Sequence, residues 1–205
     1  MPGTEPKPAK GGSLGWALGL VAIIAFALGA AIYGGGGTQP APQASGPQLG
    51  GDFALRDSAG RTVTLASLGG KPYAIYFGYT RCPDVCPTSL ARLARLRQKL
   101  GKDGDRFAIL FVSVDPDRDT PADIGRYVTL FGTPILGLTA SEKELAPMLK
   151  AYGIFAQKVL QPGGDYTVDH TASTYLMDAK GGFFGTIDHD EADASALEKL
   201  KRLIG

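Results

Sequence analysis

The sequence predicts an α/β domain, in which a central sheet is covered by helices on both faces. Three observations favour this fold class. Short apolar runs have the length and composition of buried strands, other segments repeat apolar residues at helical spacing, and the two kinds of segment alternate along the chain. From this alternation we expect a mostly parallel sheet.

The first predicted elements run from residue 53 to residue 101. Residues 53–65 contain two short strands around a Ser-Ala-Gly turn. Residues 72–80 (PYAIYFGYT) form a compact apolar and aromatic run, typical of a strand that is buried on both faces. Residues 88–101 predict a helix that ends at a glycine, because leucines recur at helical spacing opposite Arg and Lys: Leu90, Leu93, Leu96 and Leu100.

The remaining predicted elements complete the alternation. Residues 106–115 form a second buried strand, and residues 121–132 form a helix that begins at a proline and ends at a glycine. Residues 141–153 form another helix, whose first turn has the Ser and Glu spacing of a capping box. The chain then closes with a hairpin made of residues 171–178 and 182–188, followed by an amphipathic helix over residues 193–204.

Composition narrows the possible functions. The 205 residues include 21 Lys and Arg against 20 Asp and Glu, and this near-neutral balance lacks the basic footprint of a nucleic-acid-binding protein. The chain has two Cys, too few for a disulfide-stapled scaffold or a four-thiolate zinc module. With two His as well, it holds only four soft or borderline metal ligands, so each of them is a candidate.

The N-terminal part predicts a membrane anchor. Residues 14–33 are uncharged and mostly apolar, and about 20 such residues are needed to span a bilayer. The small residues at 29–31 leave open a cleaved signal peptide, although its apolar region is usually shorter. Lys7 and Lys10 precede the span and the next basic residue is Arg56, so the positive-inside rule places residues 1–13 in the cytoplasm and the rest outside.

Beyond the predicted span, the composition separates a tether from a domain. Residues 34–50 carry no charge and almost no large apolar side chain, which predicts a flexible linker. Residues 51–205 then form the exported domain, with 21 − 2 = 19 basic and 20 − 1 = 19 acidic residues once Lys7, Lys10 and Glu5 are left out. That formally neutral domain gives no sign of a strongly charged partner.

The chemistry-bearing motif is Cys82-Pro-Asp-Val-Cys86-Pro87, at the junction of a buried strand and a helix. A helix N-terminus lowers the pKa of a nearby thiol and supplies the thiolate that attack or metal ligation needs. Each Cys precedes a proline, so we expect an extended loop, with Cys86 near the N-cap and Pro87 at the first helical position. Such a loop can bring two sulfurs within reach of each other or of one ion. A structural disulfide, redox exchange and metal binding all fit this spacing.

The two histidines differ in their surroundings. His170 lies in Asp169-His170-Thr171, just ahead of a predicted strand; a lone His is often only a surface or core residue. Two thiolates with one imidazole would suit copper, whereas zinc usually takes a fourth ligand and no further Cys is present. His189 lies among acidic residues and predicts a solvated turn.

Three motifs together resemble the SCO/SenC family of copper-binding proteins. They are FGYTRCPDVCP (77–87), VSVDPDRDTP (112–121) and VDHT (168–171), and the resemblance covers roughly residues 48–205. It implies a thioredoxin-like fold, with a central mixed sheet flanked by helices, an N-terminal β-hairpin and a single transmembrane helix. It also implies copper ligation by Cys82, Cys86 and His170, and a role in assembling the binuclear copper (CuA) centre of cytochrome c oxidase.

The resemblance extends to the second motif and has one departure. Residues Asp115, Asp117, Arg118 and Asp119 match the family pattern, and we expect them to form ion pairs in a loop or to contact a partner. Arg81 stands where relatives often carry His. It lies outside the three expected ligands, and its positive charge should favour the thiolate form of Cys82.

Two functions follow from the resemblance and from thiol chemistry. In the first, the protein is a copper carrier that takes the ion from a periplasmic donor and passes it to the copper-bearing oxidase subunit. It is anchored in the bacterial cytoplasmic membrane, with its domain in the periplasm. Such a carrier needs no catalytic base. In the second, the protein is a thiol–disulfide oxidoreductase that reduces the oxidase cysteines, itself recharged by a thioredoxin-like reductant. Cys82 and Cys86 would then form a redox-active disulfide. The CxxxC spacing differs from the CxxC of thioredoxins and disfavours the second function. The two functions differ in their dependence on His170, since copper binding should need it and disulfide exchange should not.

Overall fold

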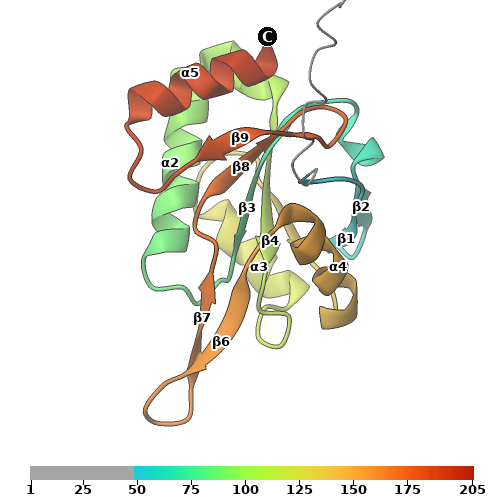
Figure 1. Cartoon of the computed structure of the whole chain (residues 1–205), viewed down its shortest axis with the longest axis vertical. Helices are drawn as coiled ribbons and strands as arrows, with labels where there is room; N and C mark the ends of the chain where they lie inside the picture. The colour runs from blue at the N-terminus through green and yellow to red at the C-terminus, as the bar shows by residue number, and fades with distance from the viewer. Residues whose placement is uncertain (1–48) are drawn as a thin grey trace, which may run out of the picture. The chain divides into compact units, whose positions relative to one another are not determined.

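The computed structural model describes residues 49–205 of this chain (Figure 1). The predicted cytoplasmic segment 1–13, the membrane span 14–33 and nearly all of the linker 34–50 lie outside the described residues. Within 49–205, no helix is both long and apolar enough to cross a membrane.

A seven-stranded sheet forms the centre of the domain, in the order β2-β1-β5-β4-β3-β8-β9 (Figure 1). Its strands are β1 (Ala54–Asp57), β2 (Thr62–Thr64), β3 (Tyr73–Gly78), β4 (Ala108–Ser113), β5 (Leu136–Thr139), β8 (Thr174–Met177) and β9 (Phe183–Ile187).

The sheet is mixed, so the expectation of a mostly parallel sheet is wrong. Only the central pairs β3–β4 and β4–β5 are parallel within the described chain. Short turns join β1 to β2 and β8 to β9, and strands joined in this way must pair antiparallel. These two hairpins flank the parallel centre, where β1 meets β5 and β8 meets β3 antiparallel as well. The mixed sheet expected from the family resemblance is the one observed.

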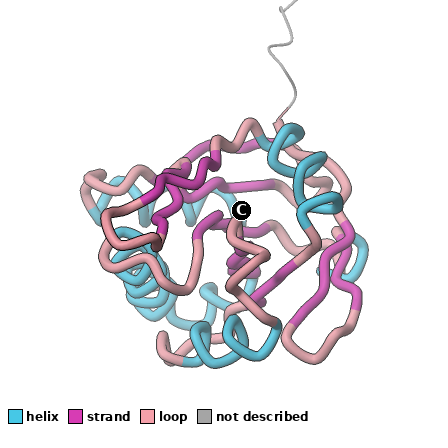
Figure 2. The backbone as a smooth tube through the Cα atoms, turned by 90° about the horizontal axis from the view of Figure 1, so that it is seen from below, coloured by secondary structure: helices cyan, strands magenta, loops and turns pink. Residues whose placement is uncertain are grey.

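Four α-helices of the described residues cover the sheet: α2 (Val85–Lys99), α3 (Pro121–Thr129), α4 (Glu142–Tyr152) and α5 (Asp193–Ile204). Figure 2 shows helical segments on both sides of the strands. The central strand β3 is buried along its whole length, and its side chains alternate between the two layers. Phe77 packs on Tyr152 of α4, with ring centroids 5.5 Å apart, whereas Tyr76 faces the opposite layer, near Cys86 of α2.

Helix boundaries follow the predictions with two corrections. The capping box of α4 is present, with Ser141 and Glu144 bonded to each other's backbone N–H groups. Helix α3 ends at Thr129, ahead of the predicted Gly132. Helix α2 begins at Val85, so Cys86 and Pro87 lie inside its first turn and the predicted extended loop is shorter. A proline fits there because first-turn N–H groups have no partner within the helix.

A second, two-stranded sheet was not predicted from the sequence. It consists of β6 (Ala156–Leu160) and β7 (Tyr166–His170), an antiparallel hairpin that projects from the body of the domain (Figure 1). Both strands mix apolar and polar residues and most of these are exposed or only partly buried, so they lack the continuous apolar run that marked the central strands. The hairpin matters for function because its last residue is His170.

Candidate metal centre

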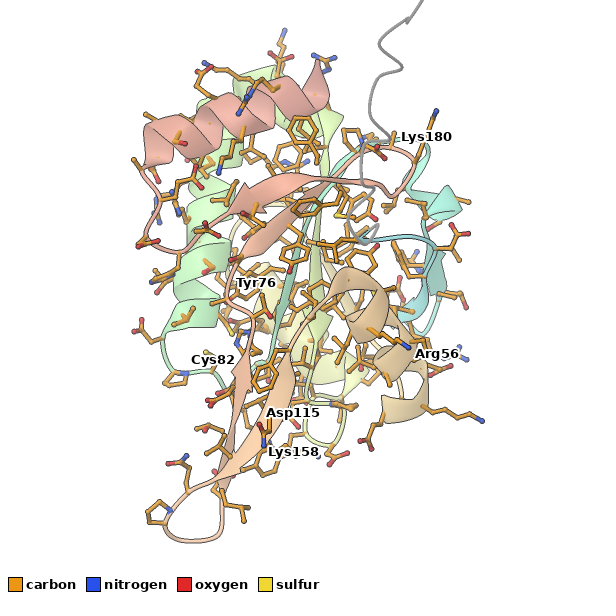
Figure 3. All side chains as sticks on the ribbon, in the orientation of Figure 1. Arg56, Tyr76, Cys82, Asp115, Lys158 and Lys180 are labelled. Carbon is orange, nitrogen blue, oxygen red and sulfur yellow. The ribbon has the colours of Figure 1, made fainter. Side chains whose placement is uncertain are left out.

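The structure brings Cys82, Cys86 and His170 together at one end of the sheet. One ligand atom from each of the three lies within 4.8 Å of the other two, and it is the one such cluster among residues 49–205. The Cys86 Sγ lies 3.3 Å from His170 Nε2. Both thiols are free, so the structural-disulfide alternative does not describe this state. Figure 3 shows Cys82 in the loop between β3 and α2, beside the β6–β7 hairpin.

The cysteine loop is held by its own backbone and by the start of α2. The backbone N–H of Cys82 donates to the Tyr79 carbonyl at 3.3 Å, which turns the chain directly after β3. The backbone N–H of Cys86 donates to Cys82 Sγ at 3.4 Å, so the first turn of the helix points a donor at the sulfur. Cys86 is fully buried and Cys82 is only partly buried, so Cys82 is the more accessible of the two cysteines.

The imidazole of His170 is held in orientation by a backbone carbonyl. Its Nδ1 lies 2.9 Å from the carbonyl oxygen of Thr171. Because a carbonyl can only accept, Nδ1 carries a proton, and Nε2 is the ring nitrogen that faces Cys86 Sγ. The rings of Tyr76 and Tyr79 stand edge-on to the imidazole, at centroid distances of 6.0 and 5.9 Å. A backbone carbonyl behind the imidazole is the usual support of a metal-binding histidine.

The two thiols have opposite ionisation behaviour. The hydrogen bond from Cys86 is the largest influence that lowers the pKa of Cys82, and His170 and backbone N–H groups act in the same direction. The pKa of Cys86 is raised, first because its proton bonds to Cys82 and then because Cys86 is buried. These opposite shifts favour a thiolate at Cys82 beside a neutral thiol at Cys86. A soft cation that binds here would displace the remaining thiol proton.

The other candidates from the sequence lie elsewhere. His189 lies exposed in a turn after β9, as the sequence predicts, and its carbonyl accepts a hydrogen bond from Arg92. Among the described residues its side chain belongs to no metal-type cluster. Arg81 is exposed, and the largest influences on Cys82 come from Cys86, burial and His170 rather than from Arg81. The expectation that Arg81 favours the Cys82 thiolate therefore finds no support here.

The acidic motif at 112–121 contacts the segments that carry the site residues, and only part of its role was predictable from the sequence. Asp115 pairs with Arg118 at 2.6 Å and Asp117 contacts Lys158, so the predicted ion pairs are present. The partners Thr80 and Tyr166 were missed. Each lies tens of residues away along the chain, and no local pattern connects them to the motif.

The fold and the site together define a thioredoxin-like protein with a soft-metal site made of two cysteines and one histidine. The chain belongs to the SCO1/SenC family, whose family model matches residues 41–205. It is 36% identical over 159 residues to protein SCO2 of Saccharomyces cerevisiae mitochondria, covering 76% of this chain and 53% of that protein. The chain thus spans about half the length of this yeast relative.

Solved structures show the same fold. ScoI of Bradyrhizobium japonicum, a structure with copper bound, is 44% identical and superposes with a TM-score of 0.69, covering 76% of this chain and 99% of that one. BsSco, described as having a disulfide switch and as a member of the Sco family of cytochrome c oxidase assembly proteins, is 25% identical with a TM-score of 0.61, covering 77% and 94%.

Proposed function

We propose that this protein carries copper to cytochrome c oxidase, holding the ion with Cys82, Cys86 and His170. One observation carries the proposal: two cysteine sulfurs and an imidazole nitrogen lie within 4.8 Å of one another. Thiolates prefer Cu(I), imidazole suits both oxidation states, and three ligands suffice for copper. The copper-bound structure of the related ScoI supports the same choice of metal.

Delivery to the oxidase is the second part of the proposal. It rests on the described role of the Sco relative in cytochrome c oxidase assembly and on the accessibility of the site. Because Cys82 is only partly buried, an incoming ligand of the copper-bearing subunit can approach the ion from the Cys82 side and replace one sulfur at a time. The receiving site in this proposal is the binuclear CuA centre, and a periplasmic copper donor loads the carrier.

The site of action in this proposal is the outer side of the bacterial cytoplasmic membrane. The support is the uncharged run 14–33 and the two lysines ahead of it. Protease treatment of spheroplasts is the test. The domain should be degraded while the cells stay intact, and protection from the protease would contradict this location.

Copper affinity tests the ligand set. We expect tight one-to-one binding of Cu(I) by the reduced protein without oxygen, measured by competition with a Cu(I) chelator. His170→Ala should weaken binding tenfold or more, about 1.4 kcal/mol. His189→Ala is the matched control and should bind as the unchanged protein does. Weak binding, or binding indifferent to His170, would overturn the carrier function.

A second function, thiol–disulfide exchange, is favoured by the state of the two cysteines. A thiolate at Cys82 beside the Cys86 thiol is the arrangement needed to attack a disulfide and then resolve the mixed disulfide. The disulfide switch described for BsSco points in the same direction. Reduction of an oxidised peptide from the oxidase copper site tests this function. If His170→Ala still reduces the peptide, the two cysteines are sufficient for disulfide exchange.

A further inference from the structure

The loop from Ser113 to Thr120, here called the acidic loop, contacts both halves of the metal site. It connects β4 to α3, and two of its carboxylates are almost completely buried: Asp115 is 0% exposed and Asp119 is 1% exposed. Buried carboxylates of this kind must be fully paired, and their partners show what the loop holds in place.

The first contact holds the cysteine loop. Asp119 accepts hydrogen bonds from the backbone N–H of Thr80 at 2.9 Å and from the Thr80 hydroxyl at 2.6 Å. It also accepts one from the Ser113 hydroxyl at 2.6 Å. Thr80 lies two residues before Cys82, at the point where the chain leaves β3. Asp119 therefore fixes the base of the loop that carries the first sulfur.

The second contact holds the strand that carries the histidine. Asp115 accepts from the Arg118 Nε at 2.6 Å and from the Tyr166 hydroxyl at 2.7 Å. The Arg118 Nη1 donates to the backbone carbonyl of Tyr166 at 3.0 Å, and its guanidinium lies over the Tyr166 ring at 3.6 Å. Tyr166 is the first residue of β7 and His170 is the last.

The two contacts are joined within the loop. The Ser113 hydroxyl, which donates to Asp119, also accepts the backbone N–H of Asp115 at 3.1 Å. Among the described residues, the β6–β7 hairpin forms a sheet of its own, and neither strand is hydrogen-bonded to a strand of the main sheet. Side-chain contacts such as these therefore have to hold the hairpin in place. Figure 3 shows Asp115 and Lys158 where the hairpin meets the body of the domain.

We propose that the acidic loop sets the position of His170 relative to the two cysteines, with Arg118 and Asp115 as positioning residues that act through Tyr166. This inference rests on the proposed copper site and adds how its geometry is maintained. Arg118 bonds to Asp115 and to the Tyr166 backbone at once, and its planar fork also stacks on the ring. Lysine keeps the charge but cannot make this set of contacts.

Copper affinity in a double-mutant cycle tests the proposal. Arg118→Lys should weaken Cu(I) binding about tenfold, the size expected for a residue that orients a metal ligand, and no more than His170→Ala does. In the His170→Ala background the same change should weaken binding less than about twofold, because the residue through which Arg118 acts is gone. Tyr166→Phe, which removes only the hydroxyl bond to Asp115, is a milder variant for use if Arg118→Lys does not fold.

Two control variants separate positioning from general loss of structure. Thr80→Val removes a bond on the cysteine side, so its loss of affinity should be the same with and without His170. Lys158→Ala removes the exposed ion pair between the same hairpin and Asp117, and exposed pairs contribute little, so binding should change less than about twofold.

The copper-free protein offers an independent measurement. The chain has only two histidines, so the NMR signals of His170 and His189 are easily told apart. In Arg118→Lys the ring signals of His170 should shift or broaden, while those of His189 stay unchanged. A loss of affinity that is equal in both backgrounds, or no loss in either, would overturn the inference. Failure of the unchanged protein to bind copper would instead overturn the proposed function.

Discussion

Gly78, the last residue of β3, makes room for the buried thiol. A β-carbon at this position would lie 2.8 Å from Cys86 Sγ and 2.9 Å from the ring of Tyr76. Both distances are shorter than van der Waals contact, and neither neighbour has space to retreat inside a close-packed core. The smallest side chain at Gly78 is therefore a condition for the site as well as for the core.

Gly78→Ala should weaken both folding and copper binding. Overpacking of a core costs about 1–3 kcal/mol, and here the displaced atom is a metal ligand. Urea unfolding and Cu(I) competition measure the two effects. Gly185→Ala in β9 is the control, because a β-carbon there meets no atom within 4 Å. If the Cu(I) affinity of Gly78→Ala is unchanged, the site can bind copper with Cys86 Sγ displaced.

The lowered pKa of Cys82 predicts an unusual pH profile for alkylation. Because its thiolate is favoured by the Cys86 hydrogen bond, iodoacetamide should modify Cys82 at pH values well below the ordinary thiol pKa of about 8.5. Reactivity should disappear only as the pH falls through the lowered pKa. Cys86, whose pKa is raised, should stay unmodified.

Mass spectrometry of the reduced, copper-free protein gives this profile. The same protein unfolded in urea is the control, and both of its thiols should react only near their ordinary pKa. An identical pH profile for folded and unfolded protein would contradict the lowered pKa of Cys82 and the raised pKa of Cys86.

At the scale of single elements, α4 illustrates a boundary that local chemistry determines. The Ser141 hydroxyl accepts from the backbone N–H of Glu144, and the Glu144 carboxylate accepts from the backbone N–H of Ser141. The residues that make this reciprocal pair are three apart in the sequence, so the start of the helix was predictable. Helix α2 differs, since Cys86 is helical although it precedes a proline, a position that disfavours the helical conformation, and its side chain is fully buried.

Removal of the α4 cap should destabilise the domain without touching the metal site. Ser141→Ala is expected to lower the free energy of unfolding by about 1 kcal/mol, measured in urea. Ser141→Thr keeps a hydroxyl group and should recover most of that loss. Cu(I) affinity should be unchanged in both variants, and a large fall in affinity would link α4 to the site in a way that its contacts do not explain.

At the scale of the whole molecule, the described residues 49–205 are sufficient to assemble the candidate site. The three candidate ligands, the two tyrosine rings beside His170 and the acidic loop all belong to this part of the chain. A chain that begins at Ser45 should therefore bind Cu(I) as tightly as the full chain. Chelator competition with both proteins measures this, and a tenfold difference would place a contribution to binding in residues 1–44.

The sequence by itself determined the fold class, most helices and central strands, and the three residues of the candidate site. Burial of β3, leucine spacing in α2 and the capping box of α4 depend on neighbouring residues, so a linear pattern reveals them. The site residues were recognisable because the chain has few soft ligands and because three motifs occur together.

Only the tertiary structure decided the direction of the strands, the β6–β7 hairpin and the support of the site. The hairpin lacks a continuous apolar run, and its attachment depends on Arg118 and Tyr166, which are 48 positions apart. Likewise the Nε2 of His170 meets the Cys86 sulfur across 84 positions. Such contacts form when the packed core brings distant segments together, and pairing of buried charges then selects one geometry, which no local pattern in the sequence encodes.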